Sequence, residues 1–254
     1  MHIEVHGSGP DLVLIHGWAM HGGIFAPLLP LLDAHFRVHV VDLPGHGYSA
    51  GAEPIDPLRC AARIAERTPR ALWVGWSFGG LVSLQAALNL PQKVRGIVEI
   101  AASPKFVATA GWPHGVAAEV FTQFGAGLLD DYRGTIERFL ALETLGSADG
   151  KDELRSLKAH VFERGEPALE VLERGLEALQ ALDLRSELSG LTLPNLWIAG
   201  RRDRLVPASA LRWSAAQNPL AQFLEIGSGH APFLSHAGEV AAAITTFAAR
   251  DALA

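Results

Sequence analysis

Short apolar runs recur along the chain, and most are followed directly by glycine, proline or a charged residue. Unbroken apolar runs of this length are typical of strands buried on both faces of a parallel sheet. The pattern predicts strands over Asp11–His16, Arg37–Asp42, Ala71–Val74, Gly96–Ala101, Leu196–Gly200 and Gln222–Ile226.

Segments with apolar residues at three-to-four spacing separate these runs. Helical periodicity covers Ile24–Leu32, where Pro27 and Pro30 interrupt it, then residues 56–67, and finally Val240–Ala249. Strands that alternate with helices at this spacing predict βαβ units and a parallel sheet. Functional residues are therefore expected at the carboxyl ends of the strands, where such sheets bind their ligands.

The middle of the chain, residues 106–184, has no strand pattern. Four amphipathic helices are predicted there, over Val116–Phe124, Asp131–Leu145, Asp152–Phe162 and Pro167–Leu182. The fold class is thus α/β, with a mostly parallel central sheet flanked by helices. Residues 1–105 and 185–254 form the predicted core, and residues 106–184 form a helical cap inserted into it.

Composition narrows the function classes. The chain has 254 residues, 49% of them hydrophobic, and a net charge of −6, which argues against non-specific nucleic-acid binding. No apolar run is long enough to span a membrane and no secretory signal is visible. Cys60 is the single cysteine, which excludes an internal disulfide and fits a cytoplasmic protein. No metal or cofactor is expected, because the sequence has no metal-ligand cluster and no dinucleotide-binding loop. The protein is expected to be a monomer.

One strand end carries the sequence Gly75-Trp76-Ser77-Phe78-Gly79, a G-x-S-x-G motif. It follows the apolar run Ala71–Val74 and leads into a helical pattern, which is the strand–turn–helix context of a nucleophile elbow. The turn is tight, and Gly75 and Gly79 lack the Cβ atoms that would collide in it. The motif predicts that Ser77 presents its hydroxyl at the carboxyl end of a strand.

A serine hydroxyl needs a base, and the base needs an orienting acid. Asp203 follows the strand Leu196–Ala199, and His230 lies on a glycine-rich loop after the next strand. The order Ser77, Asp203, His230 is the one in which α/β-hydrolase triads occur. We therefore predict these three residues as a catalytic triad.

Three other side chains are weaker candidates for the acid and the base of the triad. Asp42 ends a strand but precedes Ser77, and Asp183 lies within the helical cap. His236 lies six residues beyond His230, where the chain turns helical.

An oxyanion hole requires two backbone N–H groups that face the developing charge. Phe78 supplies the first, as the residue after the nucleophile. Trp18 supplies the second, from the loop after an earlier strand, and His16 is expected to brace that loop rather than to transfer a proton.

Several segments resemble one family within the α/β-hydrolase superfamily, the pimeloyl-[acyl-carrier protein] methyl ester esterases of biotin biosynthesis. They extend from end to end of the chain and include the cap, the variable part of this superfamily. The segments are Leu14–Trp18, Val41–Gly45, Gly75–Gly80, Glu137–Thr144, Gly175–Glu177, Asp183–Arg185 and His230–His236.

The resemblance implies that Ser77 is the nucleophile, His230 the general base and acid, and Asp203 its partner. It implies oxyanion N–H groups on Trp18 and Phe78. The same resemblance implies a substrate-binding pocket formed by Trp18, Phe78, Phe139, Leu140, Ala141, Leu142 and Glu143. Phe78 stands where the family has a leucine, and Glu143 where it has a glutamine.

The family's cap also carries basic residues that receive the acidic acyl-carrier protein. Arg138 and Arg155 match such positions, Lys151 replaces an arginine, and Arg133 is displaced by one residue. Independently of the family, Lys151, Arg155 and Lys158 are spaced so that one helix face presents all three, a stripe that attracts an acidic partner. The alternative is a solvated helix face, since Asp152 and Glu153 are neighbours.

These features predict a serine carboxylesterase that hydrolyses the methyl ester of pimeloyl-acyl-carrier protein and releases methanol. The alternatives are a general short-chain carboxylesterase, a C–C bond hydrolase or lyase of the same fold, and a non-catalytic ligand receptor. Haloalkane dehalogenase activity is disfavoured, because it requires a carboxylate where Ser77 stands.

Overall fold

The computed structural model describes residues 1–49, 51, 55–145 and 149–250. Residues 50, 52–54 and 251–254 of the predicted core and 146–148 of the predicted cap lie outside this description. Within it, one seven-stranded sheet has the strand order β1-β3-β2-β4-β5-β6-β7. The strands are β1 (His2–His6), β2 (Asp11–Ile15), β3 (Arg37–Asp42), β4 (Ala71–Trp76), β5 (Val94–Ile100), β6 (Asn195–Gly200) and β7 (Ala221–Ile226).

The sheet is parallel except for β1, which pairs antiparallel with β3 at one edge. The α/β fold class predicted from the apolar runs is confirmed. Every residue of β4 is buried, because β2 and β5 pair with it on both sides and helices cover its faces. From β2 the chain adds β3 on one side and then crosses to add β4 and the later strands on the other side. The position between β2 and β4 is therefore a topological switch point, the kind of place at which open α/β sheets bind ligands.

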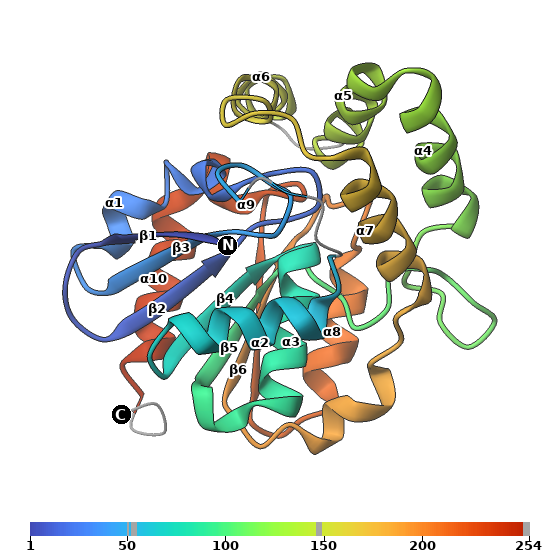
Figure 1. Ribbon diagram of the computed structural model, residues 1–254. Helices are drawn as coiled ribbons and strands as arrows, with labels where there is room; N and C mark the ends of the chain where they lie inside the picture. Colours follow the sequence, from blue (N-terminus) through green and yellow to red (C-terminus); the bar gives the residue numbers. More distant parts are fainter. Residues whose placement is uncertain (50, 52–54, 146–148, 251–254) are drawn as a thin grey trace.

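Helices cover both faces of the sheet (Figure 1). α2 (Pro57–Arg67) and α3 (Phe78–Asn89) pack side by side on one face, and α1 (Leu29–Leu32) packs against α10 (Ala237–Ala248) on the other. α8 (Ala208–Ala216) packs on β6 and β7. α3 has apolar residues on all sides and ten of its residues are buried, which fits its position over the centre of the sheet.

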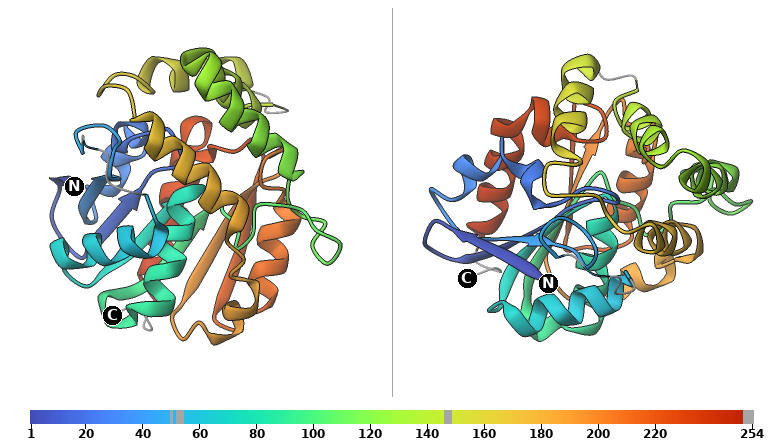
Figure 2. Two further views of the ribbon diagram at one scale, coloured as in Figure 1. Left: turned by 45° about the vertical axis from the view of Figure 1, so that its right-hand side comes forward. Right: turned by 45° about the horizontal axis from the view of Figure 1, so that its top comes forward.

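Within the described residues, four α-helices lie between β5 and β6 in the chain and stand over one end of the sheet (Figures 1 and 2). They are α4 (Ala118–Asp130), α5 (Tyr132–Glu143), α6 (Gly150–His160) and α7 (Leu169–Ala181). α4 contacts α5 and α7, and α5 contacts α6. We call these helices the cap; the exact boundaries at residues 105/106 and 184/185 stay a prediction.

Arg164, which follows α6, ties the cap to the sheet. Its guanidinium lies 3.3 Å from Asp42 Oδ2 at the end of β3 and 3.0 Å from Glu4 Oε1 on β1. The same group stacks over the Tyr48 ring, 4.7 Å from its centroid. The Arg164 side chain is largely buried, so removing it would leave the buried Asp42 side chain without this partner, a larger loss than that of a surface ion pair.

Some sequence predictions need correction. The segment Ile24–Leu32 is not one helix: a 3-10 helix (η1) covers Gly22–Phe25 and α1 forms only one turn, because Pro27 and Pro30 lack the N–H groups a continuous helix needs. Strand β1 was not predicted, since its polar and half-exposed residues lack a buried-strand pattern. Helix α8 and the short α9 (Pro232–Ser235) were also missed.

Candidate active site

Ser77 lies in the sharp turn between β4 and α3. Its backbone φ is +53°, a conformation that non-glycine residues rarely adopt outside functional sites. A Cβ atom on Gly75 would collide with the Gly79 carbonyl, and one on Gly79 would collide with the Ile15 carbonyl at the end of β2. The two glycines therefore allow the turn that carries Ser77 to close against the end of β2.

Ser77, His230 and Asp203 form one chain of hydrogen bonds. The His230 Nε2 atom lies 2.9 Å from Ser77 Oγ, and its Nδ1 atom lies 2.7 Å from Asp203 Oδ2. Ser77 follows β4, Asp203 follows β6 and His230 follows β7, so three strand ends place the three side chains. All three are buried, which strengthens the electrostatic interactions between them.

Asp203 is fixed by the backbone of its own turn. Its Oδ1 atom accepts hydrogen bonds from the N–H groups of Leu205 and Val206 at 2.8 and 2.9 Å, which leaves Oδ2 for His230. Bonds to a charged acceptor contribute roughly 1.5–3 kcal/mol each. The side chain is thereby held in one orientation, with Oδ2 facing Nδ1 of His230, so that His230 carries its proton on Nδ1 and presents Nε2 as an acceptor.

The pKa of His230 is raised above its ordinary value. Burial alone disfavours the charged imidazolium, but the Asp203 carboxylate and, at greater distance, that of Glu143 outweigh burial. A raised pKa makes the imidazole a stronger base towards the Ser77 hydroxyl.

The alternative acids and histidine are engaged elsewhere. Asp42 accepts from the N–H groups of Gly22 and Tyr48 and turns the chain after β3. Asp183 pairs with Lys105 and Arg185, and the His236 ring contacts Ser235.

The loop after β2 lies directly against Ser77. A Cβ atom on Gly17 would stand 3.2 Å from the Ser77 Cβ. His16 braces this loop: it accepts from the Leu43 N–H at Nε2 (2.9 Å) and donates from Nδ1 to the Gly17 carbonyl (2.8 Å). Burial, reinforced by His46, lowers the pKa of His16 to about 3, so its ring is neutral. Trp18, on this loop, and Phe78, at the start of α3, are thus on the two segments that flank Ser77.

Apolar side chains from the cap close over this region. The Trp18 ring packs edge-on against Phe139 of α5, with centroids 4.7 Å apart, and its Nε1 donates to the Leu172 carbonyl of α7. Phe139 and Leu140 are buried, and Leu142 is partly buried against the core. Ala141, in contrast, is exposed, so the structure does not bring its side chain to the buried face of α5.

Glu143, the last residue of α5, is the predicted pocket residue that reaches the triad. Its side chain is buried, and its Oε1 atom lies 4.0 Å from His230 Nε2. Its backbone carbonyl also accepts from the His230 N–H at 3.2 Å.

Two further groups around Ser77 were missed from the sequence. Trp76 donates from its indole Nε1 to the His230 carbonyl at 2.8 Å, which fixes the histidine loop to β4. Beneath the turn, Ser83 of α3 lies 2.6 Å from the fully buried carboxyl of Glu99 on β5. Burial raises the pKa of Glu99 well above its ordinary value, although the hydrogen bond from Ser83 opposes the rise. Neither contact has a local sequence signal, because each joins segments far apart in the chain.

The predicted carrier-docking residues lie on the outside of the cap. Lys151, Arg155 and Lys158 are all exposed on α6. Arg155 pairs with Asp152 and Lys158 with Glu137, both through solvent-exposed ion pairs. Arg138 pairs with Asp131, and Arg133 with Glu166. Exposed pairs of this kind are weak and can exchange partners.

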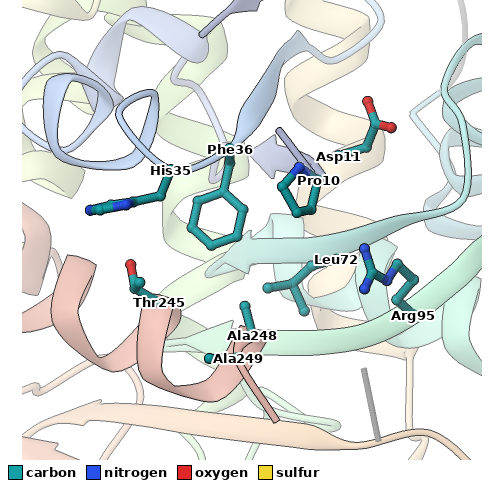
Figure 3. A pocket seen from close by; sticks show the side chains of 9 residues that line it. All are labelled: Pro10, Asp11, His35, Phe36, Leu72, Arg95, Thr245, Ala248 and Ala249. Carbon is teal, nitrogen blue, oxygen red and sulfur yellow. The ribbon is translucent and has the colours of Figure 1, made fainter. Parts of the chain in front are cut away.

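A cavity of about 200 Å³ lies far from these residues (Figure 3). Phe36, Leu72 and Ala248 give it an apolar lining, with Asp11 and Arg95 at its edge. Asp11 and Leu72 are at the amino ends of β2 and β4, opposite to the end that carries Ser77. The cavity is therefore separate from the candidate active site.

Two absences bear on function. Within residues 1–49, 51, 55–145 and 149–250, no helix is long and apolar enough to cross a membrane. In the same part of the chain, no group of three histidine, cysteine or acidic side chains is arranged to hold a metal ion.

Comparison with known proteins agrees with this geometry. The alpha/beta hydrolase family profile matches residues 12–243. An esterase from Exiguobacterium antarcticum superposes with a TM-score of 0.86 at 21% identity, covering 97% of this chain and 94% of that one. An enol-lactonase from Burkholderia xenovorans LB400 gives 0.85 at 20% identity, covering 98% and 96%. The chain belongs to the alpha/beta hydrolase family, and these distant structures bear on its fold alone.

Much nearer relatives define the particular family. A pimeloyl-[acyl-carrier protein] methyl ester esterase from Xanthomonas oryzae pv. oryzae is 55% identical over 251 residues, which covers 98% of this chain and 99% of the relative. A protein of the same name from Stenotrophomonas maltophilia is 54% identical over 253 residues, covering 98% and 96%. The chain therefore belongs to the family of pimeloyl-[acyl-carrier protein] methyl ester esterases.

Proposed function

We propose that this protein is a serine carboxylesterase that hydrolyses the methyl ester of pimeloyl-acyl-carrier protein in biotin biosynthesis. The observation that carries the proposal is the hydrogen-bonded chain Ser77–His230–Asp203 under a cap, in a protein 55% identical to esterases of that name over nearly its whole length. We also propose that the enzyme is a monomer and that it works in the cytoplasm. A single, buried cysteine agrees with that compartment.

The first half-reaction forms an acyl-enzyme. Ser77 Oγ attacks the ester carbonyl carbon while its proton passes to His230 Nε2, and the N–H groups of Trp18 and Phe78 bind the oxyanion. The bond between the carbonyl carbon and the methoxy oxygen then breaks. That oxygen takes the proton from His230, and methanol leaves.

The second half-reaction releases the acid. A water molecule gives a proton to His230 Nε2 and attacks the acyl-enzyme, and Ser77 recovers that proton as the carboxylic acid leaves, which then loses its own proton to solvent. Asp203 stabilises the imidazolium in both halves, since it lies 2.7 Å from Nδ1. Phe139, Leu140 and Leu142 of the cap give the acyl chain apolar surroundings.

The identity of the products tests this reaction. Incubation with pimeloyl-carrier methyl ester is expected to release methanol and to leave a carrier that still bears its acyl chain through the thioester. Mass spectrometry of the intact carrier measures this directly. Loss of the whole acyl chain from the carrier would mean that the thioester is cleaved instead, and would contradict the proposal.

The stripe of Lys151, Arg155 and Lys158 on α6 is proposed to receive the acidic carrier. Reversing two of its charges, with Arg155→Glu and Lys158→Glu together, is expected to raise KM for the carrier-bound ester by about tenfold or more, because electrostatic steering changes association by about 10–10³-fold. The effect should shrink as salt is added. Hydrolysis of a short nitrophenyl ester should not change.

A matched control is Arg174→Glu, which reverses an exposed charge on α7 of the same cap. This helix carries Glu170, Glu173 and Glu177, so it is an unfavourable surface for an acidic carrier. If Arg174→Glu raised KM as much as the α6 variant, the docking site would not be on α6.

A further inference from the structure

A second carboxyl group lies beside the proton-transferring end of His230. Glu143 is buried, its Oε1 atom lies 4.0 Å from His230 Nε2, and within the described residues its Oε2 atom has no hydrogen-bond partner. A buried carboxyl oxygen without a partner is costly in free energy, so its position calls for an explanation. The triad mechanism described above does not use this group.

The two carboxyl groups flank the imidazole at opposite ends. Asp203 comes from the core and meets Nδ1, while Glu143 comes from the cap and approaches Nε2, the atom that also faces Ser77. The backbone fixes this approach, because the His230 N–H donates to the Glu143 carbonyl. Glu143 is therefore placed where a proton enters and leaves Nε2.

We propose that Glu143 is a positioning residue for catalysis, whose carboxyl group shares protons with His230 and so sets the pH at which the imidazole becomes a free base. The inference rests on the proposed role of His230 as general base.

The electrostatics of the site support this role. Burial raises the pKa of Glu143 to about 8, although the attraction of the His230 imidazolium opposes the rise. The titratable groups that face the carboxyl are His230, on the loop before α9, and Asp203, on the turn after β6, whose negative charge adds to the rise. The pKa of His230 is raised as well, in part by the Glu143 charge, so the titration of each group depends on the charge of the other.

The negative charge of Glu143 determines the direction in which it shifts the pKa of His230. Whenever Glu143 is ionised, its negative charge stabilises the imidazolium and keeps the proton on His230 to a higher pH. A glutamine at this position cannot do so, whatever the protonation state of the pair. The pH below which kcat/KM falls, which reports the ionisation of the free enzyme's base, must then lie higher with glutamate than with glutamine.

The test compares the pH profiles of the wild type and Glu143→Gln on a short nitrophenyl ester, so that carrier docking does not enter. The acid limb of kcat/KM is expected to move to lower pH in Glu143→Gln, and the ratio of kcat/KM at about pH 5.5 to that at about pH 7.5 to rise severalfold. An NMR titration of the His230 ring is expected to shift in the same direction. The NMR titration does not require the variant to be active.

Two further variants complete the design. Glu137→Gln removes an exposed charge from the same helix and is expected to leave the acid limb in place. Glu143→Asp retains an ionisable carboxyl and is expected to keep the limb above that of Glu143→Gln. The inference is overturned if the acid limb and the His230 titration of Glu143→Gln coincide with those of the wild type. Failure of the proposed mechanism would look different, since His230→Ala would then retain activity.

Discussion

The variant Ser77→Ala is expected to lower kcat for ester hydrolysis by about 10⁴–10⁶-fold, because triad members act as a unit and removing the nucleophile removes the acyl-enzyme route. His230 Nε2 would then have no hydroxyl 2.9 Å away to activate. Some rate above the uncatalysed reaction should remain from oxyanion stabilisation and substrate binding. Steady-state kinetics on a short nitrophenyl ester, followed by a burst experiment, measure both the loss of turnover and the loss of the acyl-enzyme.

Ser214→Ala is a suitable control for Ser77→Ala. Ser214 is also buried, but its hydroxyl donates to the Ala210 carbonyl within α8, away from the triad. Its turnover should stay near that of the wild type. Ser77→Ala with turnover near that of the wild type would show that Ser77 is not the nucleophile.

Asp203→Asn is expected to lower kcat by about 10³–10⁴-fold through a change of tautomer at His230. The N–H groups of Leu205 and Val206 both donate to Oδ1, so the amide oxygen of an asparagine must occupy that position. Its NH₂ group then points to His230 Nδ1 and donates to it. The imidazole proton moves to Nε2, which can no longer accept the proton of Ser77.

The change of tautomer at His230 is visible by spectroscopy, and a variant that was merely destabilised would not show it. Asp203→Asn should retain its fold, and NMR should show the imidazole proton on Nε2 instead of Nδ1. Asp203→Glu, which keeps the charge, should recover part of the activity. An asparagine variant with the wild-type tautomer and wild-type turnover would contradict the assignment of Asp203.

Sequence patterns identified the parts of this molecule that depend on local chemistry. The apolar runs marked six of the seven strands, because buried parallel strands need continuous apolar residues. Ser77, Asp203 and His230 each follow such a run, and the structure brings them together because the carboxyl ends of parallel strands meet at one edge of the sheet.

Other features of the structure could not be predicted from local sequence patterns. β1 is an edge strand that is only partly buried, so its residues are not selected for continuous hydrophobicity. The contact between Glu143 and His230 joins a cap helix to a core loop, and the indole bond from Trp76 to the His230 carbonyl crosses 154 positions of the chain. The first contact depends on how the cap sits over the sheet and the second on how two strand ends of the core meet, and neither arrangement is encoded in a short motif.

We propose that the cap selects a carrier-bound methyl ester for the triad beneath it. The most direct measurement is kcat/KM for pimeloyl-carrier methyl ester beside that for free dimethyl pimelate, at the same pH and low salt. The carrier-bound ester is expected to be preferred by about 10–10³-fold, the range that electrostatic steering of an acidic partner supplies. Equal values for the two esters would contradict the claim and leave a general short-chain carboxylesterase.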